Sequence, residues 1–379
     1  VYFRWNEIPG SDDVPNADPW YRVERNGRRA ARVTDPQEIR RIPADDIAWD
    51  PGNHVAAWGR DSTLVVWDGE ETRVVLSLNE EVRNVRFHSP GRVHFETGES
   101  LYQYAIANGT LETVARRTTK DESTATEAGE WLADQQQTLF RYTRDQEARE
   151  AAVAAARRET AAAQELPVPA ADRVDNIMLS PDGRFLTFRA RTPATNRPAT
   201  EYIDYVDASG YSTVHEARAK AGEPRDVVRL GILPFDPANA EDTLAIRWVT
   251  LAEAGSQSTV PHGPFWSPDG RRALLQFIGE DHKDLWFAEL DVESGSTTVI
   301  THDHDDAWIG GPPVQANYLG PALLKWLPDG RWVFASERTG WSHLYLVDED
   351  GMISPLTSGA WEVRAAAISR SRDYWLLQT

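Results

Sequence analysis

Cysteine is absent from this 379-residue chain, and methionine occurs only twice. Without cysteine, the chain can form neither a disulfide nor a thiolate zinc site, and it has no cysteine nucleophile. No apolar run approaches the roughly 18 residues that span a membrane, and no secretory signal is visible. The opening residues Val1–Trp5 resemble a strand already under way, so we expect a trimmed start.

Basic residues are also scarce, because 40 lysines and arginines face 59 aspartates and glutamates, for a net charge of −19. Phosphate backbones and anionic membranes repel such a surface, so we expect no nucleic-acid partner. The same field attracts cationic groups such as a peptide amino terminus.

Sequence motifs for catalysis and cofactors are missing. There is no Gly-x-Ser-x-Gly nucleophile elbow: Gly340-Trp341-Ser342-His343-Leu344 begins like one but lacks the closing glycine. Its flanks are typical of strands, which favours a hairpin. Phosphate-binding, dinucleotide-binding and calcium-loop patterns are absent. We therefore predict no catalytic residue and no cofactor in this chain.

One polar cluster, His302-Asp303-His304-Asp305-Asp306, could bind a metal. On a strand, alternation would place both histidines on one face. No further ligand motif accompanies them, so we favour a polar loop after a strand ending at Thr301, and we predict no metal site.

A Pro-Asp-Gly phrase recurs along the chain between apolar runs. Proline presets the second turn position, aspartate tolerates the third and glycine supplies the fourth, so each copy predicts a hairpin. The copies are Ser180-Pro181-Asp182-Gly183, Ser267-Pro268-Asp269-Gly270 and Leu327-Pro328-Asp329-Gly330, with weaker ones at Pro51 and Pro90.

A second strand pair follows each hairpin, for example 284–290 with 297–301, and 343–347 with 353–356. The first two turn prolines lie about one blade length, roughly 40–50 residues, apart. The next two gaps indicate either two blades or one blade with an insertion. We therefore predict an all-β chain: an incomplete β-propeller of the seven- to eight-bladed type over residues 1–379, with four-stranded antiparallel blades.

Residues 121–166 break this pattern. No glycine or proline lies between Trp131 and Leu166, and 148–163 are rich in alanine, arginine and glutamate. This composition favours a long helical insertion, and a charged disordered loop is the alternative.

Tryptophan is abundant, with 15 residues. Trp49, Trp266 and Trp326 occupy equivalent positions before the turns, which indicates packing within blades. A sugar-binding propeller is the other interpretation of so many indoles.

Several stretches resemble the N-terminal propeller of dipeptidyl peptidase IV and its bacterial relatives in the prolyl oligopeptidase family. The most specific is Ser336-Glu337-Arg338-Thr339-Gly340-Trp341-Ser342-His343-Leu344-Tyr345, continued at 356–363; Asp306–Gly310 and 219–224 add to it. The resemblance implies a parent serine exopeptidase whose Ser-Asp-His triad lies in an α/β-hydrolase domain. Because the chain ends inside a blade, we expect that domain and the remaining strands to lie outside it.

The resemblance also implies two substrate contacts. The family's glutamate pair, which holds the peptide amino terminus, corresponds most nearly to Trp131–Gln136, so we predict Asp134, with Glu130 beside it, as substrate-binding. Glutamines at 135 and 136 put strict dipeptide release in doubt. The family's carbonyl-binding arginine corresponds to Arg60 in Trp58-Gly59-Arg60. A further contact of the family, made by an Arg-Phe pair in the loop after Trp308, is replaced in this chain by Gly311-Pro312, so we expect that contact to be lost.

From these features we predict a non-catalytic propeller that gates access to a peptidase and anchors short peptides. Its expected partners are those peptides, the hydrolase domain and a second copy in a homodimer. Its expected location is periplasmic or extracellular. The alternative is a stand-alone propeller that serves as a protein-binding scaffold.

Overall fold

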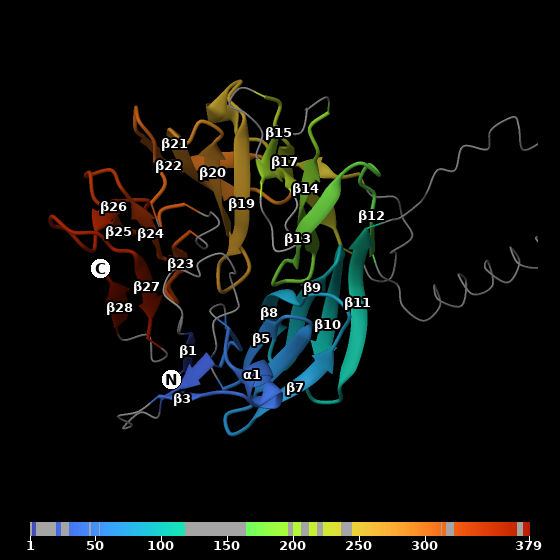
Figure 1. Ribbon diagram of the computed structural model, residues 1–379. Helices are drawn as coiled ribbons and strands as arrows, with labels where there is room; N and C mark the ends of the chain where they lie inside the picture. Colours follow the sequence, from blue (N-terminus) through green and yellow to red (C-terminus); the bar gives the residue numbers. More distant parts are fainter. Residues whose placement is uncertain are drawn as a thin grey trace, which may run out of the picture. The chain divides into compact units, whose positions relative to one another are not determined.

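The computed structural model of the chain describes residues 2–4, 20–23, 30–44, 47–52, 54–117, 164–195, 200–205, 212–217, 223–235, 245–311, 313–315, 322–369 and 374–379 (Figure 1). The chain divides into two compact units, residues 1–114 and 115–379. Each unit has cores of its own.

Strands in the first unit form sheets from consecutive segments. One three-stranded sheet contains β1 (Tyr2–Arg4), β2 (Trp20–Arg22) and β3 (Ala31–Arg32). A four-stranded sheet contains β4 (Ala48–Trp49), β5 (Ala56–Arg60), β6 (Thr63–Trp67) and β7 (Thr72–Ser77). The next contains β8 (Arg83–Ser89), β9 (Arg92–Thr97), β10 (Ser100–Ala105) and β11 (Thr110–Arg117), which crosses into the second unit.

The second unit repeats the four-stranded plan. One sheet contains β13 (Arg173–Leu179), β14 (Phe185–Thr192), β17 (Val227–Pro234) and β18 (Arg247–Trp248), and the hairpin β15 (Thr200–Asp204)–β16 (Thr213–Ala217) interrupts it in sequence. The next contains β19 (Thr259–Trp266), β20 (Ala273–Gly279), β21 (Asp284–Leu290) and β22 (Thr297–His304). The last full sheet contains β23 (Leu324–Trp326), β24 (Trp332–Ser336), β25 (His343–Val347) and β26 (Ile353–Pro355), followed by the pair β27 (Ala365–Ile368) and β28 (Trp375–Gln378).

The Pro-Asp-Gly phrases form the predicted turns. Gly183 and Gly270 have φ of 74° and 70°, in the left-handed region that favours glycine. The side chain of Ser180 accepts hydrogen bonds from the backbone N–H groups of Arg184 and Phe185, and Ser267 accepts one from Arg272. These turns join the first two strands of their sheets, as the sequence predicts.

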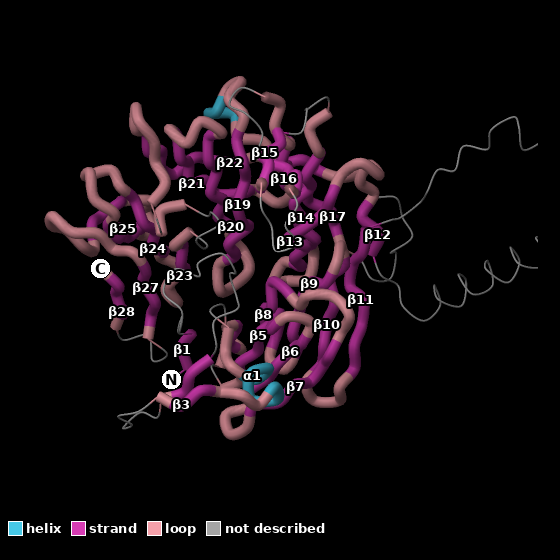
Figure 2. The backbone as a smooth tube through the Cα atoms, viewed as in Figure 1, coloured by secondary structure: helices cyan, strands magenta, loops and turns pink. Residues whose placement is uncertain are grey.

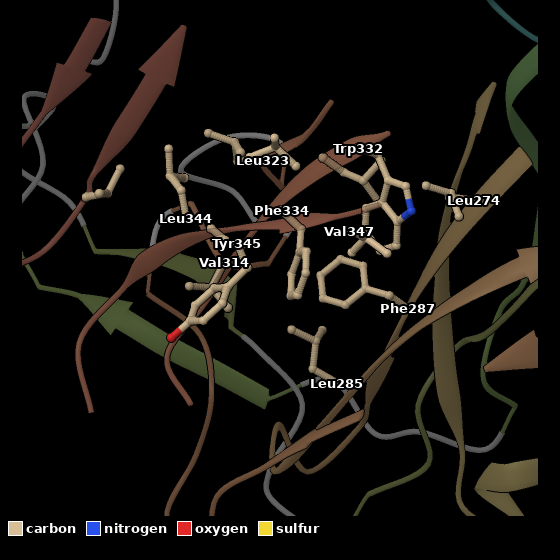
Figure 3. Packing of buried hydrophobic residues seen from close by; sticks show 14 of the residues in the cluster. Leu274, Leu285, Phe287, Val314, Leu323, Trp332, Phe334, Leu344, Tyr345 and Val347 are labelled. Carbon is tan, nitrogen blue, oxygen red and sulfur yellow. The ribbon is translucent and has the colours of Figure 1, made fainter. Parts of the chain in front are cut away.

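Alternating residues of the β19–β22 sheet serve two different cores. Leu274, Leu285 and Phe287 pack against the β23–β26 sheet, whereas Leu275 and Trp286 pack toward the β13–β18 sheet. Figure 3 shows the first core, where the rings of Phe287, Phe334 and Trp332 meet. Burying each such side chain contributes about 1.5–3 kcal/mol.

This face-to-face stacking of four-stranded antiparallel sheets confirms the all-β, propeller-type fold class. The structure identifies why two turn spacings are long: the β15–β16 hairpin lengthens one blade, and residues 118–163 separate β11 from β12. Figure 2 shows how strands dominate the described part.

Two expectations need correction. Residues 121–163 of the predicted helical insertion lie outside the described residues, but Gln164–Leu166 at its end form β12, which pairs in parallel with β11. Their backbone groups pair with the edge of a sheet, which explains why these three residues are extended. Trp266 and Trp326 pack against blade cores as predicted, whereas Trp49 is 39% exposed and meets Trp67 edge to face.

Helices are short in the described residues. The α-helix α1 (Pro36–Arg41) starts at Asp35, whose carboxylate accepts from the N–H of Gln37 at 2.9 Å, and a 3₁₀ turn covers Ala252–Ala254. Neither they nor any other helix in the described ranges has the length and apolarity to cross a membrane.

Two histidines, the buried His94 and the partly buried His262, make the free energy of unfolding depend on pH. Burial lowers the pKa of His94 to about 4, with the charges of His88, Arg86 and Arg92 adding to the effect, and burial with the charge of Arg189 lowers that of His262 to about 4. The unfolded chain takes up these protons near pH 6.5 and the folded chain does not.

We therefore expect the free energy of unfolding to decrease as the pH drops from 6.5 to 4, by roughly 3 kcal/mol for His94. His94→Gln removes this titration. The difference in the free energy of unfolding between wild type and variant should therefore become smaller toward acidic pH. Urea unfolding at several pH values measures it, and parallel curves for the two proteins would contradict the assignment.

Candidate functional site

Arg60, predicted to bind a substrate carbonyl, ends strand β5. Its guanidinium donates to the carbonyl oxygens of Ile42 at 2.9 Å and Pro43 at 3.3 Å, and it lies 4.9 Å from the ring centroid of Trp20. These hydrogen bonds satisfy backbone carbonyl groups directly after α1, so Arg60 has a structural role. Its role toward a substrate stays a prediction.

Glu130 and Asp134, the predicted anchors of a peptide amino terminus, lie outside the described residues. Their role therefore also stays a prediction.

Trp308 and Glu337 both lie next to Gly310, in the stretches where the sequence most resembles a known family. Glu337 begins the turn between β24 and β25, and its carboxylate accepts from the backbone N–H of Gly310 at 3.3 Å. The indole of Trp308 lies over Gly310, since a Cβ at Gly310 would stand 2.5 Å from Trp308 Cζ3. Trp308 is 61% exposed, and Trp341 in the same turn is 42% exposed. We call Asp305, Trp308, Glu337, Trp341 and Glu362 the Glu337 corner.

The Glu337 corner combines acids with exposed indoles. Burial raises the pKa of Glu337, hydrogen bonds from the backbone of Gly310 and Gly311 oppose that rise, and the nearby charges of Glu362 and Asp305 add to it. A carboxylate crowded by other acids gains from a positively charged partner, and indole faces attract the same kind of group. The corner therefore suits a cationic ligand such as an ammonium.

A partly buried ion pair next in sequence to Glu337 joins two blades. Arg338 donates to Asp303 at 2.7 Å and to Thr301 at 3.0 Å, while Ser336 Oγ donates to the other oxygen of Asp303 at 2.6 Å. The guanidinium also lies about 5 Å from the rings of Phe334 and Tyr345. Asp303 is 7% exposed, so these donors replace the water that would otherwise hydrogen-bond to its side chain.

The predicted polar loop after Thr301 is wrong for residues 302–304, because strand β22 continues to His304. Register pairs Asp284 with His304 and Trp286 with His302 on neighbouring strands. Asp284 Oδ1 lies 2.7 Å from His302 Nε2 and 2.8 Å from His304 Nδ1. The alternation that we considered for these histidines is the observed one, and it forms an Asp-His-His cluster.

The pKa directions of Asp284 and His304 agree with hydrogen bonding within the cluster. Burial raises the pKa of Asp284, but hydrogen bonds from His304, His302 and Gln257 outweigh it and lower the pKa. Hydrogen bonds to Asp284 and Asp306 raise the pKa of His304. Asp284, His302 and His304 offer three ligand atoms within 4.8 Å of one another, a donor set that can hold a metal ion.

Ser342 confirms the hairpin interpretation of the partial Gly-x-Ser motif. It lies at the end of the turn before β25, and its buried Oγ has no hydrogen-bond partner within the described ranges. The neighbouring His343 is engaged by Thr357 at 3.1 Å and by the carbonyl of Gly359 at 3.0 Å. A serine without a base at hydrogen-bond distance is not an activated nucleophile.

Sequence reasoning missed Asp284 and the pairing of Glu337 with Gly310. Asp284 starts a strand that the sequence did predict, so extending the antiparallel register past Thr301 would have placed it opposite His304. Glu337 was noticed only as part of a family-like stretch.

Comparison with known families gives one match. Residues 172–374, more than half of the chain, match the model described as the dipeptidyl peptidase IV N-terminal region. This span contains the three full blades of the second unit, the Glu337 corner and the Asp-His-His cluster.

Two solved structures are similar over most of the chain. Dipeptidyl peptidase 4 from Porphyromonas gingivalis matches with 15% identity and a TM-score of 0.49, covering 92% of this chain and 46% of that one. A puromycin hydrolase matches with 15% identity and a TM-score of 0.47, covering 86% of this chain and 42% of that one. The chain thus spans less than half the length of each.

We expect Arg338→Ala to destabilise the protein by about 3–5 kcal/mol, because it leaves Asp303 buried without its cation. The added Asp303→Ala change should then cost less than it does alone, which a double-mutant cycle from urea unfolding measures. Arg331→Ala, which removes an exposed ion pair with Asp329 in the same blade, is the control and should have a much smaller effect. Additive single-mutant effects at 303 and 338 would contradict the coupling.

Proposed function

This chain belongs to the dipeptidyl peptidase IV N-terminal region family, and on that premise we propose that it is the non-catalytic propeller of a serine exopeptidase. In this proposal it gates access to the catalytic domain and holds the amino end of short peptides. The family match over residues 172–374 carries the proposal, because that span includes the stretch 336–345 on which the sequence resemblance rests.

Electrostatics support the choice of an amino terminus as the anchored group. The chain carries a net charge of −19, and a field of that sign concentrates cations in a confined space. Within the described residues, the Glu337 corner adds exposed indoles beside acids, which is a suitable surface for guiding an ammonium. Asp134, with Glu130, would form the final charge-assisted hydrogen bonds, and Arg60 would orient a substrate carbonyl.

The chemistry itself is assigned to a separate α/β-hydrolase domain with a Ser-Asp-His triad. The propeller would contribute selection: stacked blades exclude folded proteins, while a short peptide with a free amine is drawn in and positioned. Uniform binding of this kind lowers KM more than it raises kcat. A homodimer and a periplasmic or extracellular location belong to the same proposal.

The test uses the full gene product and one peptide in two forms, with a free and with an acetylated amino terminus. Asp134→Ala should raise KM for the free-amine peptide about 10- to 100-fold, the loss expected for a hydrogen bond to a charged group, and leave the acetylated peptide nearly unchanged. Steady-state kinetics on both forms measure this.

Asp145→Ala, an acid in the same 121–166 segment, is the matched control and should change neither KM. Equal effects of Asp134→Ala on both peptides would remove the anchoring role. A gene product without peptidase activity that instead retains a specific protein partner would overturn the proposal in favour of a scaffold.

A further inference from the structure

The Asp284, His302 and His304 side chains form a three-ligand site on the outer two strands of the β19–β22 blade. We propose that this site binds one divalent transition-metal ion, specifically Zn²⁺. The proposal is independent of the proposed function, since no residue of the site belongs to the predicted peptide contacts.

The ligand set fits zinc chemically. Two imidazole nitrogens and one carboxylate oxygen are ligands that Zn²⁺ takes at about 2.0–2.2 Å, and three protein ligands leave a fourth position for water. Nitrogen-rich sites of this type disfavour Ca²⁺ and Mg²⁺, which prefer oxygen.

The ligand atoms are already converged. His302 Nε2 and His304 Nδ1 lie 2.7 and 2.8 Å from Asp284 Oδ1. An ion at zinc bond lengths holds neighbouring ligand atoms about 3.3 Å apart in tetrahedral geometry. The two separations from Asp284 Oδ1 therefore have to lengthen by about half an ångström, while all three ligand atoms already lie within 4.8 Å of one another, and the ion then takes the place of the shared protons.

Each ligand is oriented by a second contact. The ring of His302 stacks on Trp286 with centroids 4.8 Å apart and planes at 3°. His304 Nε2 lies 3.4 Å from Asp306 Oδ1, the carboxylate-histidine arrangement that fixes the tautomer of a metal-bound imidazole. Asp284 Oδ2 accepts from Gln257, whose amide also contacts Asp281.

Backbone structure holds the site in place. Asp303, between the two histidines, is buried on the opposite side of β22 against Arg338 and Ser336. Since successive side chains of a strand point to opposite faces, this contact directs both histidines toward Asp284. The N–H of Asp305 donates to the carbonyl oxygen of Lys283 at 3.0 Å, which extends the backbone hydrogen bonding at this end of the β21–β22 strand pair.

The site is also reachable. The side chains of His302 and His304 are 42% and 50% exposed, and that of Asp284 is 14% exposed. An ion can enter from solvent, and the fourth position stays open to water or to a group from another molecule.

The test is Zn²⁺ binding by the chelator-treated full chain, measured by isothermal titration calorimetry and by the shift in unfolding temperature. Wild type should bind one ion per chain and unfold at a higher temperature with Zn²⁺. His302→Gln and His304→Gln should each weaken binding by more than about 100-fold, and Asp306→Asn by about 10- to 100-fold.

His215→Gln, on the separate β15–β16 hairpin, is the control and should bind like wild type. Circular dichroism of each variant without metal should match wild type, which separates ligand loss from misfolding. If a glutamine variant does not fold, Asp284→Asn, which keeps the shape of the side chain, takes its place with the same expected loss. Absence of Zn²⁺ binding by wild type, or equal binding by the folded ligand variants, would overturn the proposal.

Discussion

The ion pair between Asp303 and Arg338 is the constraint on which the second unit depends most. Its Asp303 end is buried, it joins β22 of one blade to the turn after β24 of the next, and Ser336 donates a further hydrogen bond to Asp303. Breaking such a pair leaves an uncompensated charge, so the two blades are held in one register. Because side chains alternate along a strand, fixing Asp303 on one face also fixes His302 and His304 on the other.

The apolar cores follow the same alternation. In β20 and β21, neighbouring residues contribute to two separate clusters, one with each adjacent blade. A single blade would therefore expose one apolar face or both, which explains why these sheets occur in a stack. The ion pair gives this non-directional packing a specific alignment, since hydrophobic contacts alone tolerate sliding.

Much of this architecture could be predicted from sequence, because tight turns have strong local chemistry. The Pro-Asp-Gly phrases placed the first strand pairs of the blades, and the strands predicted at 284–290 and 343–347 have those bounds in the structure. The end of β22 was predicted wrongly, because His302-Asp303-His304 resembles a loop in composition and only the register with Asp284 indicates that the strand continues. Its extended form depends on Asp284 and Arg338, which are distant in sequence, and β12 likewise depends on pairing with β11.

The same limit applies to function. The family-like stretch 336–345 was visible in the sequence, and its match to the dipeptidyl peptidase IV N-terminal region extends over 172–374. What that stretch does physically became clear only in three dimensions: the carboxylate of Glu337 accepts from the N–H of Gly310, while the next residue, Arg338, forms an ion pair with Asp303. One acid is thus paired with a cation within the chain, whereas the other accepts a backbone hydrogen bond and has its pKa raised by burial. The buried acids are satisfied within the chain: Asp172 and Asp303 face Arg229 and Arg338, and Asp50 accepts from backbone N–H groups. The domain can therefore remain folded with a net charge of −19, and a field of that sign favours cations around it.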